Sequence, residues 1–163
     1  MKKLLNSTII VVSLMTSSLA YAQNAILFKG GYGRGDNSGN KFLSFGLQTT
    51  PISKWNCLKL NYEVGVLTIS ELTEGVSYFG TLAPTLLIKT ELGLYASASQ
   101  GLTIISAKNK YLDNNLQFST HVSAGLYRNS ISLGVFFHHI SSAHNSNGNI
   151  GMEFIGIESG LEF

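Results

Sequence analysis

This sequence has few charged residues, a single cysteine and, beyond its first residues, no long apolar run. Charged residues make up 12% of the chain, against about 25% in ordinary soluble domains. With so few charges, a water-soluble protein would have difficulty covering its surface. The lone Cys57 excludes an intramolecular disulfide, even in an oxidising compartment. No apolar stretch after Ala22 approaches the ~20 residues of a membrane-spanning helix, so only strands would allow the chain to enter a membrane.

The first residues have the pattern of a cleavable export signal. Two lysines precede a short apolar run, and Ala20-Tyr21-Ala22 supplies the small residues that signal peptidase requires. The run is about 11 residues long, too short for a membrane anchor. We therefore expect residues 1–22 to be a signal peptide, and residues 23–163 to form a single domain.

Several classes of function are excluded by what is missing. Removing Lys2 and Lys3 from the eleven basic residues leaves nine, equal to the nine acidic residues. A net charge near zero argues against a nucleic-acid partner, which would require a basic patch. The glycine-rich stretch at 30–35 lacks the spacing of a dinucleotide-binding fingerprint. The chain also lacks the Gly-x-Ser-x-Gly elbow of soluble α/β-hydrolases.

Apolar and polar residues alternate over much of the remaining chain. One such series is Leu58, Leu60, Tyr62, Val64 and Val66, which alternates with Lys59, Asn61, Glu63 and Gly65. Alternation over about ten residues, bounded by turn residues, predicts a strand with one apolar and one polar face. Eight strands are predicted, over 25–34, 41–50, 55–69, 76–88, 91–106, 115–126, 130–141 and 150–163. Their connections alternate between longer and shorter, as in an up-and-down barrel.

These features predict an all-β fold, an eight-stranded antiparallel up-and-down transmembrane β-barrel of a Gram-negative outer membrane. The last strand supports this interpretation, because it ends on Phe163 and resembles the C-terminal targeting signal of bacterial outer-membrane barrels. Eight strands leave a lumen that side chains fill, so a solute pore is not expected. The alternative is a soluble lipocalin-type barrel that carries a lipophilic ligand, with its apolar face turned inward. Periodicity alone does not separate the two.

Polar residues interrupt the apolar face in the last hairpin. The outward series of the seventh strand continues past Phe137 into His139 and Ser141, and that of the eighth strand begins with Glu153. If the hairpin is symmetric about Ser146, Glu153 lies directly opposite His139, with Cβ atoms about 5 Å apart. Ser141 and His139 share a face at about 6.5–7 Å. Serine beside histidine beside carboxylate is the arrangement of nucleophile, base and orienting group in serine hydrolases.

The topology also predicts the depth of these three side chains. If both termini are periplasmic, the seventh strand runs outward and the loop over 142–148 is extracellular, so the three residues lie near the outer-leaflet interface. Polar groups on a lipid-facing wall are unfavourable for stability. They suit an enzyme whose substrate is a lipid beside the barrel, and in that leaflet the lipid is the lipid A part of lipopolysaccharide.

The C-terminal hairpin resembles the lipid A 3-O-deacylase (PagL) family of outer-membrane barrels. The family pattern of His-x-Ser-Asn-Ala followed by Asn-x-Gly-x-Glu is similar to 139–143 and 149–153 here. The resemblance implies Ser141 as nucleophile, His139 as general base and Glu153 as the orienting carboxylate, in hydrolysis of the ester-linked 3-hydroxyacyl chain of lipid A. It also implies an oxyanion-stabilising role for Asn149. Ser142 replaces the family's Asn. No metal or cofactor is implied.

Other interpretations of these residues remain open. His138 is expected to point into the lumen, and His144 to lie in a solvated turn rather than to join a metal site. The main alternative function is a non-catalytic small barrel, either an adhesin or a membrane-stabilising protein, that uses the loops over 35–39 and 107–114. A homodimer through the apolar walls is compatible with the sequence, although no residue requires it.

Overall fold

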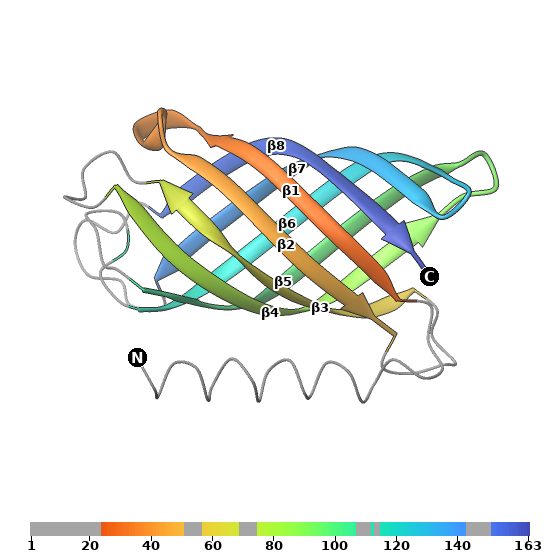
Figure 1. Ribbon diagram of the computed structural model, residues 1–163, viewed down its shortest axis with the longest axis horizontal. Coiled ribbons are helices and arrows are strands. Elements are labelled where there is room, and N and C mark those ends of the chain that lie inside the picture. Colours follow the sequence, from red (N-terminus) through yellow and green to blue (C-terminus); the bar gives the residue numbers. More distant parts are fainter. Residues whose placement is uncertain (1–23, 51–56, 69–74, 107–111, 113–114, 143–150) are drawn as a thin grey trace.

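The chain forms one closed barrel in which each strand pairs with its sequence neighbours and the last strand pairs with the first (Figure 1). The computed structural model describes residues 24–50, 57–68, 75–106, 112, 115–142 and 151–163. The strands are β1 (Ala25–Gly33), β2 (Lys41–Thr49), β3 (Leu58–Thr68), β4 (Val76–Lys89), β5 (Leu94–Ile105), β6 (Leu116–Arg128), β7 (Ile131–Ser142) and β8 (Met152–Glu162), with a short 3-10 helix η1 (Gly35–Asn37) after β1. The predicted eight-stranded antiparallel barrel is confirmed. Among the described residues, no helix has the length and apolarity to cross a membrane.

The two ends of the barrel differ. At one end, here called the termini end, the backbones of Asn24 and Phe163 exchange hydrogen bonds of 3.2 and 2.9 Å. Strands β1, β3, β5 and β7 finish at the other end, called the loop end (Figure 1). The connection from β6 to β7 is the two-residue turn Asn129–Ser130, with φ values of 48° and 66°. Positive φ at both central residues is the geometry of a tight hairpin turn whose twist matches its strands.

Most predicted strand ends differ from the observed ones by one to three residues, and two of the differences have a clear local cause. The strand predicted from residue 91 begins at Leu94, because residues 91–93 complete a turn that ends on Gly93 with φ of 78°. The strand predicted to end at 126 continues to Arg128. The positive φ of Asn129 and Ser130 confines the reversal to these two residues, so the preceding pair stays in the ladder.

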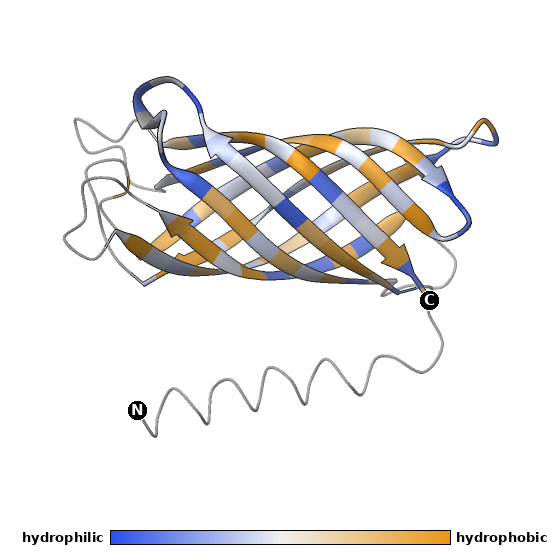
Figure 2. Ribbon diagram, turned by 45° about the horizontal axis from the view of Figure 1, so that its top comes forward, coloured by the Kyte–Doolittle hydropathy of each residue, from blue (hydrophilic) through white to orange (hydrophobic). Residues whose placement is uncertain are grey.

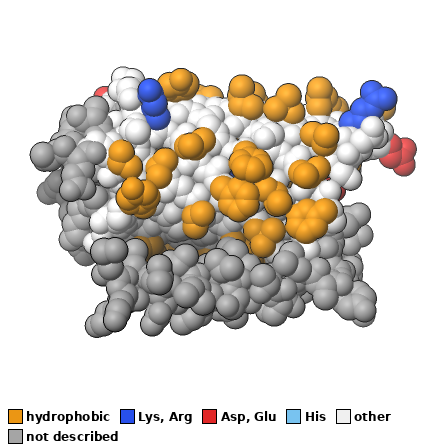
Figure 3. All heavy atoms as spheres, in the orientation of Figure 1, with side chains coloured by type: hydrophobic (Ala, Val, Ile, Leu, Met, Phe, Trp, Pro, Cys, Tyr) orange, Lys and Arg blue, Asp and Glu red, His pale blue; other side chains and the backbone are white. Residues whose placement is uncertain are grey.

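The outer wall is apolar, as a lipid-facing wall requires. Val135 and Ile157 are 63% and 60% exposed, and apolar side chains are scattered over the barrel face in Figure 3. Apolar and polar residues alternate along each strand, which gives the banding seen in Figure 2. A water-soluble monomer rarely exposes so much apolar surface. The apolar face therefore turns outward, which is the reverse of the lipocalin-type alternative.

The inner face divides into a polar and an apolar half. In the polar half, Lys29 Nζ donates a 2.7 Å hydrogen bond to Glu63 and Tyr95 donates one of 2.9 Å to Glu158. His121 lies 3.2 Å from the carboxylate of Glu158. Both acidic residues are buried in the lumen, each beside a polar partner. Pairing is needed there because an isolated buried charge is strongly unfavourable.

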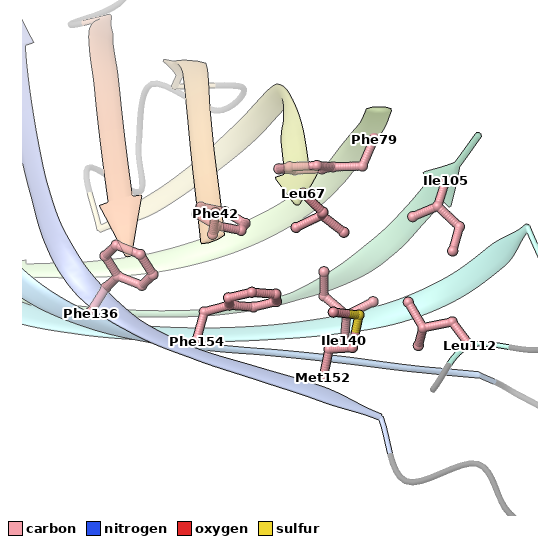
Figure 4. Close-up of a cluster of buried hydrophobic side chains, with 9 residues drawn as sticks. All are labelled: Phe42, Leu67, Phe79, Ile105, Leu112, Phe136, Ile140, Met152 and Phe154. Carbon is pink, nitrogen blue, oxygen red and sulfur yellow. The ribbon is translucent and has the colours of Figure 1, made fainter. Parts of the chain in front are cut away.

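The apolar half fills the barrel toward the loop end (Figure 4). Its members are all at most 5% exposed: Phe42, Leu67, Phe79, Ile105, Leu112, Phe136, Ile140, Met152 and Phe154. Phe42 is central, with its ring centroid 5.2 Å from that of Phe79 and 5.3 Å from that of Phe154. These rings occupy the lumen as a packed core, which gives the final hairpin a rigid inner support.

Candidate active site

The outward series of β7 changes from apolar to polar toward the loop end. Ile131, Leu133 and Val135 are exposed on the outer wall, and His139 and Ser141 continue the same alternating series. The residues between them point inward, since His138 and Ile140 are 1% and 0% exposed. The packing of Ile140 and its neighbours in the lumen therefore fixes the strand with His139 and Ser141 on the outer face.

Glu153 on β8 is paired directly with His139 on β7, so the predicted register of the hairpin is confirmed. The Nδ1 atom of His139 lies 3.8 Å from Oε1 of Glu153, with the side chains 32% and 43% exposed. This separation is longer than a hydrogen bond. Hydrogen bonds in catalytic sites are often long before substrate binds and shorten in the reacting complex. Because Nδ1 faces the carboxylate, the other ring nitrogen is left for a second partner.

Gly151, just before β8, contacts the histidine ring from the loop side. Its φ is +73°, and a Cβ added there would lie 2.9 Å from both Cε1 of His139 and the backbone oxygen of Ile140, and 3.2 Å from Nε2 of His139. Only glycine combines this backbone conformation with such close approach at low cost. The turn into β8 thus packs against the imidazole and limits its rotation. In the sequence, the one sign of this contact with the His139 ring is the glycine two residues before Glu153.

Other residues singled out from the sequence lie elsewhere. His138 is in the lumen as predicted, with its ring centroid 5.0 Å from that of Phe42. Ser142 belongs to the inward series of β7, where it pairs with the buried Gln117, so it does not share the outer face of Ser141. Asn149 and His144 lie outside the described residues, and their roles stay predictions.

The site also has a neighbour that the sequence did not indicate. Thr120 on β6 is paired directly with His139, and it is exposed on the outer wall. In the sequence it is one member of an alternating series, and nothing local marks it. Only the strand register places its side chain next to that of His139 on the outer face.

Comparisons with known proteins show the family and the fold of the chain. A family model described as lipid A 3-O-deacylase (PagL) matches residues 35–162. No curated protein matches the chain. The crystal structure of the outer membrane enzyme PagL superposes with a TM-score of 0.60 at 18% identity, covering 84% of this chain and 98% of that one.

Two further solved structures share the barrel. A de novo designed transmembrane β-barrel gives a TM-score of 0.61 at 15% identity, covering 86% of this chain and 95% of that one. Neisserial surface protein A gives a TM-score of 0.55 at 10% identity, covering 87% and 96%. At such low identities these three structural matches establish the fold alone, whereas the match to the family model extends through the last hairpin.

Proposed function

We propose, since this chain belongs to the lipid A 3-O-deacylase (PagL) family of outer-membrane enzymes, that Ser141, His139 and Glu153 form its hydrolytic triad. The observation that carries the assignment is the direct pairing of His139 with Glu153 on the outer wall, two residues from Ser141. Serine hydrolases are recognised by this geometry of nucleophile, base and orienting group rather than by fold. The substrate is lipid A of lipopolysaccharide, lying against the apolar wall in the outer leaflet with the loop end extracellular.

The proposed reaction has two halves. In the first, Ser141 Oγ attacks the carbonyl carbon of the ester at the 3 position while His139 takes the hydroxyl proton. The C–O bond to the sugar then breaks, His139 returns the proton to the sugar oxygen, and the acyl group stays on Ser141. In the second, His139 deprotonates a water from the loop end, and the water oxygen attacks the acyl carbonyl. The bond between the acyl group and Ser141 Oγ then breaks, His139 returns the proton to Ser141 Oγ, and a 3-hydroxy fatty acid is released.

The carboxylate and the oxyanion donors complete the mechanism. Glu153 holds Nδ1 of His139 and stabilises the imidazolium that forms when the ring takes the proton. The tetrahedral intermediate carries a negative oxygen that needs hydrogen-bond donors, and one such donor is typically worth about 2.7–4 kcal/mol in the transition state. We assign one of these donors to Asn149, on the match of 149–153 to the family pattern.

Mass spectrometry of lipid A tests this function directly. Lipid A from Gram-negative cells that carry the gene is expected to lose the mass of one ester-linked 3-hydroxyacyl chain, compared with cells that lack it. Heat-modifiable mobility of the protein on a denaturing gel verifies that the barrel is folded in those cells. Unchanged lipid A in the presence of folded barrel would favour a non-catalytic membrane protein.

The contact of Gly151 with the imidazole gives a second test. Gly151→Ala is expected to lower the rate of deacylation by about 10²-fold, because the added Cβ would meet both the His139 ring and the backbone oxygen of Ile140. The ring or the strand that carries it must then shift, and small misplacements of catalytic groups have effects of this size. The rate is measured on purified lipid A in detergent micelles. Gly75→Ala is the matched control, since Gly75 has a similar φ of +65° but no atom within 4 Å of its added Cβ. Equal rates in both variants would show that Gly151 has no positioning role.

A further inference from the structure

A row of polar side chains leads away from the site across the outer wall. Glu153 pairs with His139, His139 with Thr120, and Thr120 with Gln100 on β5. Side chains paired in this way stand on one face with Cβ atoms about 5 Å apart. The row runs deeper into the wall as it leaves the site, since Glu153 lies one residue from the loop end of β8 and Gln100 lies five residues from that of β5.

Thr120 and Gln100 stand out from their surroundings. Both are exposed, and the other outward residues of β5 and β6 are apolar except Arg128 at the termini end. The two residues also help to line a hollow in the outer wall, together with Pro84, Ala98 and Leu102.

An amide in a lipid-facing wall is unfavourable unless it binds something, and polar residues at such positions commonly mark a functional site. The chemistry of this pair limits the ligand to a neutral one. A hydroxyl and a carboxamide donate and accept hydrogen bonds but carry no charge. Because Arg128 is the sole cation in the outward series of β5 to β8, a phosphate would find no counter-charge there. Neutral oxygens at this depth belong to the acyl region of a lipid, as hydroxyl or ester groups.

We propose that Thr120 and Gln100 form a substrate-binding subsite for the oxygen substituents on the acyl chains of the lipid cleaved at Ser141. This proposal rests on the triad assignment, because the subsite is defined by its distance from the scissile ester. Thr120, one strand from His139, binds an oxygen close to the ester carbonyl, and Gln100, two strands away, binds one farther along. The subsite makes the enzyme selective for hydroxylated acyl chains and sets the direction in which the chain lies across the wall.

The polar side chain of Gln100 also has a possible structural role, and the experiment must distinguish this role from substrate binding. Pro84 follows Gln100 in the same row, and the pairing of β4 with β5 is interrupted between Leu82↔Leu102 and Thr85↔Ser99. Proline has no backbone N–H to complete a ladder. The Gln100 amide would then serve a backbone group left open by this gap, and its removal would lower barrel stability without changing substrate preference.

The experiment compares two esters of equal chain length and identical leaving group, one with a 3-hydroxyacyl chain and one with a plain acyl chain, in detergent micelles. The enzyme is expected to prefer the hydroxylated ester in kcat/KM by about 3- to 10-fold, the effect of one net hydrogen bond. In the double variant Thr120→Val with Gln100→Leu this ratio falls to about one, while kcat/KM for the plain ester is retained. Ser159→Ala, on the outward series of β8 near the termini end, keeps the preference of the unmodified enzyme.

The outcomes separate the subsite from the triad. The subsite is wrong, and the triad stands, if hydrolysis depends on Ser141 but the double variant still prefers the hydroxylated ester. The same conclusion follows if the unmodified enzyme does not prefer the hydroxylated ester. A lowered melting temperature with unchanged preference assigns Gln100 to barrel stability and also overturns the subsite. If folded protein hydrolyses neither ester, or Ser141→Ala hydrolyses both at the normal rate, the proposed function itself fails and the subsite falls with it.

Discussion

Ser141→Ala is expected to abolish deacylation of lipid A, with a loss in kcat on the order of 10⁵- to 10⁶-fold, the size seen when a serine hydrolase loses its nucleophile. In the proposed mechanism the alanine removes the oxygen that forms the acyl-enzyme and leaves no alternative route, because a water attacking directly would lack the positioning that the strand provides. The barrel itself is unaffected, since Ser141 lies on the outer face and not among the buried lumen residues. The measurement is release of 3-hydroxy fatty acid from lipid A in micelles.

Ser159→Ala is the control for that substitution. It makes the same chemical change on the outer wall of the neighbouring strand, where Ser159 pairs with Leu133 near the opposite end of the barrel. Full activity is expected, with heat-modifiable mobility unchanged in both proteins. Activity in the Ser141→Ala protein within about 10-fold of normal would exclude a covalent serine mechanism, and a direct attack of water promoted by His139 would replace it.

The fold was predictable because a membrane barrel repeats one rule along the whole chain. Each strand must alternate between a lipid face and a lumen face, and turns must interrupt that alternation. Where the prediction was wrong, as at residues 91–93, the deciding factor was backbone conformation at Gly93, which the alternation does not encode. The sequence pattern also could not show that the inner face divides into halves. Phe42 and Phe136 sit in the inward series beside serines and histidines, and their clustering depends on the stagger of the strands around the barrel.

The candidate site was predictable to the extent that it lies within one hairpin. The symmetry of the β7–β8 connection was enough to place Glu153 opposite His139, as the structure confirms. Thr120 and Gln100 come from other hairpins, so their alignment with His139 depends on the register of every strand between them. The contact of Gly151 with the imidazole required the path of the backbone into β8. The alignment of two residues within one hairpin can be predicted from the sequence, whereas the alignment of residues across several strands requires the three-dimensional structure.

Glu153→Gln is expected to lower kcat by about 10³- to 10⁴-fold with little change in KM, an effect comparable to amidation of the triad carboxylate in other serine hydrolases. The amide keeps the size of the side chain but removes the negative charge that stabilises the imidazolium. It can also present an N–H to Nδ1, which favours the tautomer with its proton on Nε2, the nitrogen that must accept the proton of Ser141. Because Glu153 faces His139 and not the ester, substrate binding is retained.

Glu153→Asp distinguishes loss of charge from loss of position. Aspartate keeps the carboxylate but places it farther from Nδ1, which is already 3.8 Å from Oε1 in the unmodified chain, so an intermediate rate is expected. With the carboxylate 43% exposed, water would screen part of its charge if substrate did not cover it. In the proposed complex, lipid A against the outer wall excludes that water and strengthens the interaction. The loss of kcat in Glu153→Gln should therefore be larger on intact lipid A than on a small soluble ester. Equal losses of kcat on the two substrates would show that lipid does not cover the carboxylate.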